Sequence, residues 1–151
     1  MRDALNKTGR QIFYSICSWG TDKVWEWGNV TGNSWRTTMD IQNSWTSIYI
    51  NFNENQEHPE SAGPGGWNDP DMLEVGNGGL TLREERTHFA LWAFAKAPLI
   101  IGCDLTKVSA ESLAILKAKE LIKLNQDSLG QQMRCAQNCS WDSTITSYVS
   151  Y

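Results

Sequence analysis

Residues 62–79 read AGPGGWNDPDMLEVGNGG, and the rest of the chain is best interpreted starting from this stretch. It places the carboxylates of Asp69 and Asp71 and the indole of Trp67 between glycines and prolines, which bend the backbone. Such turns are common, and an Asp within one usually hydrogen-bonds its own backbone. A turn that faces only solvent, however, gains nothing from the apolar residues that begin at Met72. The stretch therefore indicates a rigid loop that presents polar groups at the end of a strand.

Outward from this loop, short apolar runs alternate with helical patterns. The expected strands are residues 11–17, 34–41, 67–73 and 99–103, and the expected helices are residues 1–7, 43–52, 82–96 and about 109–124. Loops are expected at 18–34 and 53–66, and a last strand is expected within 145–151. About four strand–helix repeats favour parallel βα units, and a closed barrel needs about 250 residues. The pattern therefore predicts an α/β fold that is half of a (β/α)8 barrel, followed by the start of a further β domain.

The composition limits the classes of molecule that this chain is expected to bind. The formal net charge of -4 and the lack of a Lys/Arg cluster argue against nucleic acid. No apolar run approaches the roughly 18 residues that cross a bilayer, and the first residues lack the apolar core of a signal peptide. Eight tryptophans suit the faces of sugars, although most of them are expected to fill the core. Glycosylation sequons at Asn6, Asn29 and Asn138 predict a secreted or lysosomal-type location for the full-length protein.

The four cysteines are too few for a disulfide scaffold. Cys135 and Cys139 could form a local disulfide, and they lack the second pair that a zinc site needs. Cys17 and Cys103 are expected as small buried residues near strand ends.

The run GGWNDPDMLEVG at residues 65–76 closely resembles the signature of the α-galactosidases and α-N-acetylgalactosaminidases of glycoside hydrolase family 27. The resemblance extends from about residue 1 to about residue 130. It implies that residues 1–127 are the C-terminal half of a catalytic (β/α)8 barrel, about strands five to eight. Residues 128–151 would then be the junction to an antiparallel β domain and its first strand. The implied substrate is an α-galactoside, with no metal or organic cofactor.

Retaining cleavage of a glycoside needs one carboxylic acid to protonate the leaving oxygen and a second carboxylate to attack the anomeric carbon. The segment WRTTMDI at residues 35–41 resembles the acid/base segment of the family, so Asp40 is expected to be the proton donor. Arg36 matches the arginine that contacts the sugar. Asp71 and Met72 are expected to face the sugar pocket, whereas Asp69 could equally be a structural acid that caps the turn.

The segment Cys17-Ser18-Trp19 is expected to line the same pocket. Many relatives carry Glu after this cysteine, where it helps to recognise the 2-position of the sugar. Ser18 resembles the N-acetylgalactosaminidases, whereas the Trp and Gly that follow it resemble the plant and fungal α-galactosidases. We therefore expect an exo-α-galactosidase, with an α-N-acetylgalactosaminidase as the alternative.

The nucleophilic aspartate of the family lies in a Lys-x-Asp segment that has no match in this chain. The chain alone is therefore expected to be inactive. A third alternative is a non-catalytic carbohydrate-binding protein or a degenerate barrel. Asp104 and Asp127 also fit their family surroundings, and we expect both to have capping or junction roles.

Overall fold

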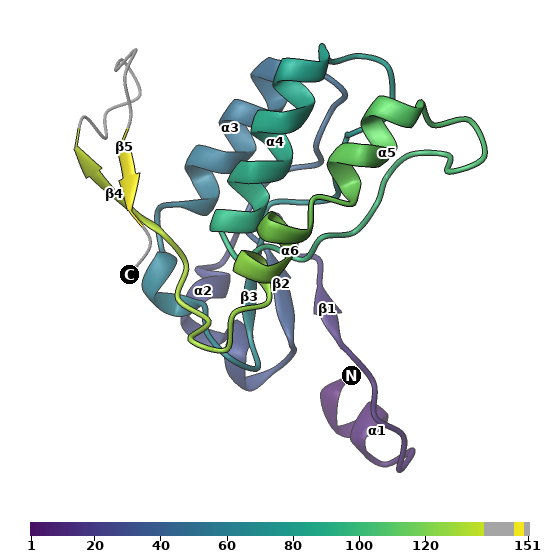
Figure 1. Ribbon diagram of the computed structural model, residues 1–151. Coiled ribbons are helices and arrows are strands. Elements are labelled where there is room, and N and C mark those ends of the chain that lie inside the picture. Colours follow the sequence, from purple (N-terminus) through teal and green to yellow (C-terminus); the bar gives the residue numbers. More distant parts are fainter. Residues whose placement is uncertain (138–146, 150–151) are drawn as a thin grey trace.

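The computed structural model describes residues 1–137 and 147–149, with side chains described for residues 1–134 (Figure 1). Its centre is a parallel sheet in the order β1-β2-β3, formed by β1 (Ser15–Ile16), β2 (Ser34–Arg36) and β3 (Trp67–Asp69). A single parallel bridge between Leu73 and Ile101 brings a fourth extended segment alongside. Each neighbour is reached by a crossover connection, as in βα units.

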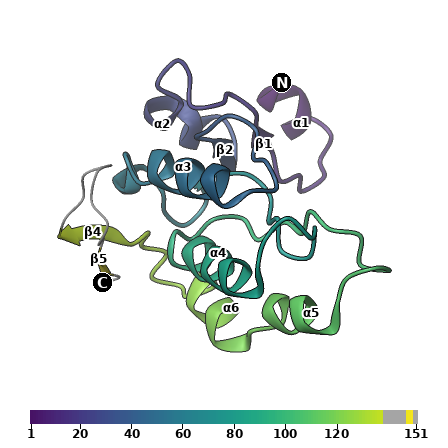
Figure 2. The ribbon, with the colours of Figure 1, turned by 90° about the horizontal axis from the view of Figure 1, so that it is seen from above.

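Helices cover this sheet on one side. Figures 1 and 2 show α4 lying between α3 and α6, with α5 beside them. The helical segments are α1 (Arg2–Asn6), α2 (Val24–Trp27), η1 (Gly28–Val30), α3 (Trp45–Asn55), η2 (Pro59–Ser61), α4 (Leu82–Phe94), α5 (Ala110–Leu116) and α6 (Lys119–Asn125). Helix α4 begins at a capping box, in which Thr81 and Glu84 satisfy each other's backbone N–H groups.

The larger hydrophobic core lies between α3, α4 and the segment after β3. Apolar residues three and four positions apart put Ile48 and Phe52 of α3 against Phe89 and Trp92 of α4. All four side chains are at most 2% exposed. Burying each one contributes about 1.5–3 kcal/mol relative to exposure, so this face fixes α3 and α4 relative to the strands.

A smaller core surrounds Trp35 of β2, which packs with Ile16 and Val24. The Trp35 indole donates a hydrogen bond to Asn68 Oδ1 at 2.7 Å. A Cβ on Gly28 would lie 2.6 Å from the Trp35 ring, so only glycine lets the backbone of η1 approach this closely. The expected loop 18–34 therefore contains α2 and η1, because Val24 and Gly28 pack against this tryptophan.

The strands are shorter than the sequence predicted, and the segments at the two sides of the sheet are only partly buried. Residues 99–103 form one bridge instead of a strand, and Ile100 and Ile101 are 48% and 40% exposed. At the other edge Phe13 is 61% exposed, outside the short strand β1. In the described part of the chain, neither edge has a further strand to pair with, and apolar residues expected in the core therefore face outward.

The expected helix 109–124 is two helices. Ser109 caps α5 as predicted, but Ala118 is extended, with ψ of 93°, and separates α5 from α6. This break lets Ile115 and Leu121 each pack on the core beside α4. The expected loop 53–66 holds the short helix η2.

At the C-terminal end, β4 (Arg134–Gln137) pairs antiparallel with β5 (Ser147–Val149), which confirms a final strand within 145–151. The further antiparallel β domain and its boundary at residue 128 stay predictions. The Cys135–Cys139 disulfide that the sequence allows lies outside the residues whose side chains are described. None of the helices in the described residues is both long and apolar enough to cross a bilayer.

We expect this chain, expressed alone, to aggregate. The exposed side chains of Phe13, Ile100 and Ile101 lie at two unpaired sheet edges, which are templates for association with other copies. Light scattering after size-exclusion chromatography would measure the effect. The variant Phe13→Ser/Ile101→Ser should aggregate less than the unmodified chain, whereas a matched change on the helical surface, Thr87→Ser, should not. A soluble unmodified monomer with one sharp unfolding transition would contradict this expectation.

Candidate active site

The polar residues expected to carry chemistry gather at the carboxyl ends of the parallel strands. Arg36 is the last residue of β2 and Asp69 is the last residue of β3, and the two are register partners. Asp40 and Asp71 follow these strands by a few residues and therefore lie at the same end of the sheet, where the strands finish. In (β/α)8 enzymes the active site lies at this end of the barrel.

Arg36 joins the two carboxylates. Its Nη2 lies 2.8 Å from Asp71 Oδ2 and 3.2 Å from Asp40 Oδ1, and it also donates to the carbonyl oxygen of Thr38 at 3.1 Å. The guanidinium is largely buried and cannot lose its charge in a protein. A fixed positive charge thus holds the loop after β2 against the loop after β3.

Asp71 is held from several sides. Its Oδ2 accepts from the backbone N–H of Ile41 at 2.9 Å, and its Oδ1 accepts from that of Met72 at 2.8 Å. The indole of Trp92 in α4 donates to its carbonyl oxygen at 2.8 Å. Asp71 has φ of 87°, a conformation that costs a residue other than glycine about 1–3 kcal/mol and that clusters at functional sites. The surrounding contacts compensate for this cost and fix the carboxylate.

Asp40 is accessible by comparison. Its side chain is 70% exposed and accepts from Arg36 and, at 3.1 Å, from Trp19 Nε1. Trp19 has a positive φ of 52°, and Gly20 beside it donates its N–H to the carbonyl oxygen of Arg36. A Cβ on Gly20 would lie 2.2 Å from the carbonyl oxygen of Thr37, so this turn requires glycine. The turn brings the Trp19 indole to Asp40.

Asp69 is part of the turn. It is 5% exposed, and its Oδ1 accepts from the backbone N–H of Asp71 at 2.9 Å. Burial raises the pKa of Asp69 above its usual value, against the lowering effects of that hydrogen bond and of Arg36. This position matches the structural alternative considered for Asp69, because its carboxylate supports the backbone of Asp71.

The other expected site residues lie near this group without joining the Arg36 contacts. The Ser18 hydroxyl bonds within its own turn, to the carbonyl oxygen of Thr21 at 3.3 Å. Met72 is 38% exposed beside Asp71. Cys17 is exposed, so the expectation that it is buried is wrong, because it follows the edge strand β1. Cys103 is only partly buried.

Sequence reasoning missed Asn51 and Trp92. The Asn51 amide, 4% exposed, donates to the carbonyl oxygens of Met39 at 3.0 Å and Pro70 at 3.1 Å, and so ties together the loops that carry Asp40 and Asp71. A signal for it exists, since Asn51 lies on the buried face of the predicted helix, three residues after Ile48. Trp92 follows the apolar pattern of α4 and gives no such signal.

Asp104 and Asp127, the other two acids in segments that resemble the family, have local roles, as predicted. Asp104 Oδ1 accepts from the backbone N–H and the hydroxyl of Thr106 at 2.9 and 2.7 Å. These bonds and Lys107 lower the pKa of Asp104. Asp127 Oδ1 accepts from the backbone N–H of Leu129, and its Oδ2 lies 4.0 Å from Lys96 Nζ.

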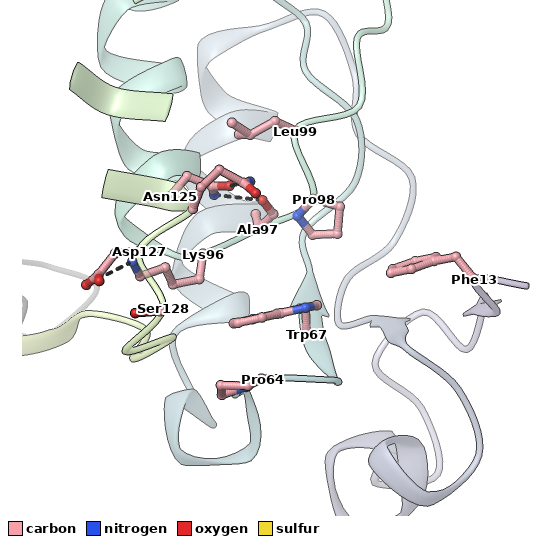
Figure 3. A pocket seen from close by; sticks show the side chains of 11 residues that line it. Phe13, Pro64, Trp67, Lys96, Ala97, Pro98, Leu99, Asn125, Asp127 and Ser128 are labelled. Carbon is pink, nitrogen blue, oxygen red and sulfur yellow. Dashed lines mark hydrogen bonds and ion pairs between the residues drawn. The ribbon is translucent and has the colours of Figure 1, made fainter. Parts of the chain in front are cut away.

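Asp127 also lines a hollow of about 360 Å³ near the residues that precede the strands (Figure 3). There the rings of Phe13, Trp67 and Pro98 face open space beside Lys96. Arg36, Asp40 and Asp71 do not line it. At this end of a barrel, residues serve stability more than catalysis, so the candidate site is the group around Arg36.

This group can hold polar ligand atoms and transfer a proton. Asp71 and Arg36 offer a fixed acceptor and fixed donors, whereas the exposed Asp40 can reach a reacting oxygen. Among the described residues, no three His, Cys, Asp or Glu side chains lie together as a metal site would require.

Comparison with known proteins shows which family this chain resembles over most of its length. The family model described as "Alpha galactosidase A" matches residues 1–127. Alpha-galactosidase 3 of Arabidopsis thaliana is 57% identical over 137 residues, which cover 91% of this chain and 31% of that protein. The α-galactosidase of rice (Oryza sativa subsp. japonica) is 50% identical over 138 residues, covering 91% of this chain and 33% of that protein. The chain thus spans about a third of the length of these relatives.

A solved structure of similar fold is that of the α-galactosidase from Saccharomyces cerevisiae with raffinose. It superposes with a TM-score of 0.88 at 40% identity, over 89% of this chain and 35% of the yeast chain. The α-galactosidases of this kind are (β/α)8 barrel enzymes, and the described residues form a partial α/β unit with a parallel sheet. On the family model, the identities and the fold together, the chain belongs to the α-galactosidase family, glycoside hydrolase family 27.

Proposed function

We propose that this chain supplies the C-terminal half of the catalytic barrel of a retaining exo-α-galactosidase, which removes terminal α-linked galactose from oligosaccharides, galactomannans or glycoconjugates. The full-length enzyme would combine this chain with the remaining two thirds, roughly, of the length of its relatives. In this proposal Asp40 is the general acid/base. Arg36, Asp71 and Met72 bind the sugar, together with Cys17, Ser18 and Trp19.

The observation that carries the proposal is the unequal burial of the two acids that Arg36 joins. The Asp71 side chain is 13% exposed and accepts fixed backbone donors, which suits a residue that binds and orients sugar hydroxyls. The Asp40 side chain is 70% exposed at the same guanidinium, which suits a proton donor that must reach the leaving oxygen. In this proposal Asp40 supplies one of the two carboxyl groups that retaining cleavage needs.

In the first step Asp40 donates its proton to the glycosidic oxygen while the bond from this oxygen to the anomeric carbon breaks. The second carboxylate, from outside this chain, forms the new bond to that carbon. In the second step the Asp40 carboxylate takes a proton from water, and the water oxygen displaces the enzyme carboxylate. Arg36 and Trp19 orient the Asp40 carboxylate in both steps through their contacts with Oδ1.

Galactose is favoured over N-acetylgalactosamine, because the relatives reported above are named α-galactosidases. The alternative rests on Ser18, whose small side chain could leave room for an acetamide group. The exposure of Asn6 and Asn29 supports a secretory location, because both sequon asparagines are accessible to glycosylation.

His88 in α4 supports the backbone beyond Met72. It is fully buried, and its Nε2 accepts from the backbone N–H of Glu74 at 3.0 Å, which requires the neutral imidazole. Burial lowers the pKa of His88 from 6.5 to about 3. The unfolded chain takes up this proton as the pH falls below 6.5, whereas the folded chain does so only near pH 3. The contribution of His88 to stability is therefore complete above pH 6.5 and is lost as the pH falls towards 3.

The substitution Asp40→Asn in the full-length enzyme should lower turnover of substrates with sugar leaving groups by about 10²–10⁴, because these need protonation to depart. Substrates with an activated aryl leaving group should lose less in the first step. Steady-state kinetics on both substrate types, with calorimetric binding of galactose, would measure the effect. Galactose affinity should remain.

The matched control is Asp104→Asn, which changes an exposed acid and keeps an oxygen for its local cap. This variant should turn over both substrates normally. Unchanged turnover of the sugar-linked substrate by Asp40→Asn would remove Asp40 from the acid/base role.

The substitution His88→Gln should make the free energy of unfolding depend less steeply on pH below pH 6.5. Between pH 6.5 and about 3, His88 should contribute a slope of up to about 1.4 kcal/mol per pH unit. Urea unfolding of the full-length enzyme at several pH values would test this. The control Thr87→Ser changes an exposed residue of the same helix that carries no titratable group, and it should retain the slope of the unmodified enzyme. Equal slopes for His88→Gln and the unmodified enzyme would refute this role for His88.

A further inference from the structure

The segment that joins α6 to β4 is built into the fold, although it forms no helix or strand of its own (Figure 1). Met133 is buried in the larger core, and its backbone N–H donates to the carbonyl oxygen of Phe94 at 3.2 Å. Gln132, beside it, is only 4% exposed, which is unusual for a glutamine. A buried amide needs hydrogen-bond partners, and the partners of Gln132 lead towards the candidate active site.

The Gln132 amide joins two parts of the chain that lie far from it in sequence. Its Nε2 donates to the carbonyl oxygen of Asn55, at the end of α3, at 3.0 Å. Its Oε1 accepts from Nδ2 of Asn68, the middle residue of β3, also at 3.0 Å. Both polar atoms of the side chain are therefore bonded, and the segment after α6 is held to α3 and to β3 at once.

The Asn68 amide extends this contact across the sheet. Its other N–H donates to the carbonyl oxygen of His58 at 2.8 Å, and its Oδ1 accepts from the Trp35 indole of β2. Asn68 is the register partner of Trp35, and the next residue of each strand belongs to the site, namely Asp69 and Arg36. Because successive side chains of a strand point to opposite faces, these amides lie on the face of the sheet opposite to the site.

The contact with Asn55 reaches the same strand ends by a second path. Asn55 Oδ1 accepts from the Thr37 hydroxyl at 2.6 Å. This hydroxyl also lies 3.2 Å from the carbonyl oxygen of Asp69, which accepts from the backbone N–H of Thr37 at 3.0 Å. Thr37 follows Arg36 directly in the sequence. The two paths from Gln132 therefore end at Asp69 and at the two neighbours of Arg36.

We propose that Gln132 is a positioning residue for the candidate active site. From the segment after α6, it holds the ends of β2 and β3 and so sets where Arg36 and Asp71 meet the sugar. Asp71 depends on this support because its backbone N–H donates to Asp69 Oδ1. A displacement of about 1 Å, caused by a change far from the chemistry, can cost about 100-fold in rate. The inference rests on the proposed α-galactosidase function for its substrate, whereas the network itself lies within this chain.

A glutamine that only stabilised the fold would have a different signature. Its loss would lower the free energy of unfolding, but the folded enzyme would bind galactose as before. The contacts favour positioning, because a buried amide bonded through both polar atoms specifies one arrangement of its partners. An apolar side chain of the same size would fill the space without this constraint. Measurements on the folded enzyme therefore decide between the two roles.

The first test replaces Gln132 by methionine, which has a similar length and makes neither hydrogen bond. In the full-length enzyme, Gln132→Met should raise the Kd for galactose by about three- to thirty-fold, the range by which changes in such networks affect coupled sites. It should lower kcat/KM for p-nitrophenyl α-galactoside by a similar factor. Calorimetry and steady-state kinetics would be run at a temperature at which circular dichroism shows that every variant is folded.

The matched control, Gln131→Met, makes the same chemical change at the exposed neighbour. Both of its values should stay within about two-fold of those of the unmodified enzyme. An unchanged Kd and kcat/KM for folded Gln132→Met would overturn the proposal.

A second pair of variants tests the path through Asn55 and decides the matter if Gln132→Met does not fold. Thr37→Val removes the hydroxyl and should weaken galactose binding, whereas Thr37→Ser keeps the hydroxyl and should not. The double variant Gln132→Met/Thr37→Val should bind no more weakly than Gln132→Met, because that change already breaks this path. Equal binding by the two Thr37 variants, or losses that multiply in the double variant, would contradict the network.

Hydrogen exchange separates this inference from the proposed function, because it needs no substrate. The backbone N–H groups of Thr37 and Asp71, which bond to Asp69, should exchange about three- to thirty-fold faster in Gln132→Met than in the unmodified enzyme. The N–H groups of α5, which lies outside the network, should exchange at the same rate in both proteins. If the enzyme neither binds nor cleaves galactosides, the proposed function fails, and the exchange rates still decide whether Gln132 holds the strand ends. Equal acceleration at α5 and at the strand ends, or none at either, would refute the positioning role.

Discussion

The site depends on one buried positive charge. Arg36 Nη2 lies within 3.2 Å of two carboxylates that come from different loops, and it also donates to the carbonyl oxygen of Thr38. Without this charge, the largely buried Asp71 would lack its ion pair, and a buried carboxylate without a partner is costly. The same charge orients the exposed Asp40. The Arg36 side chain therefore contacts one buried, fixed carboxylate and one exposed, accessible carboxylate. The proposed chemistry requires this difference in accessibility.

The rest of the fold keeps this arginine and its partners in place. Parallel pairing puts Arg36 and Asp69 side by side, so the loops that follow β2 and β3 begin at the same edge. Asn51 of α3 ties these loops together, and Trp92 of α4 holds the carbonyl oxygen of Asp71. The helices that bury the apolar core thus also position the polar site, which explains why the core and the site share the residues of α3 and α4.

Much of the fold and of the candidate site could be predicted from the sequence, because strong local patterns indicate it. The loop that contains Asp71, the alternation of strands and helices, and the caps at Thr81 and Ser109 all have turn or capping chemistry that is visible in the residues themselves. Unpaired edges are expected of half a barrel, but the residues that lie there were not predicted. Phe13 and Ile101 look like core residues, and only the pairing of the strands shows that they are exposed in the described chain. Asn51 acts through tertiary contacts with the loops after β2 and β3, and a single sequence does not reveal such contacts.

Two double-mutant cycles that share Arg36→Gln would test the role of Arg36 most directly. The variants Arg36→Gln, Asp71→Asn and Asp40→Asn, with the two doubles that contain Arg36→Gln, would be compared by urea unfolding of the full-length enzyme. We predict a coupling free energy of about 2 kcal/mol between Arg36 and Asp71, because both are shielded from water, and less than about 1 kcal/mol between Arg36 and the exposed Asp40. Equal couplings, or a coupling near zero for Arg36 with Asp71, would contradict a fixed acid and an accessible acid set by one arginine.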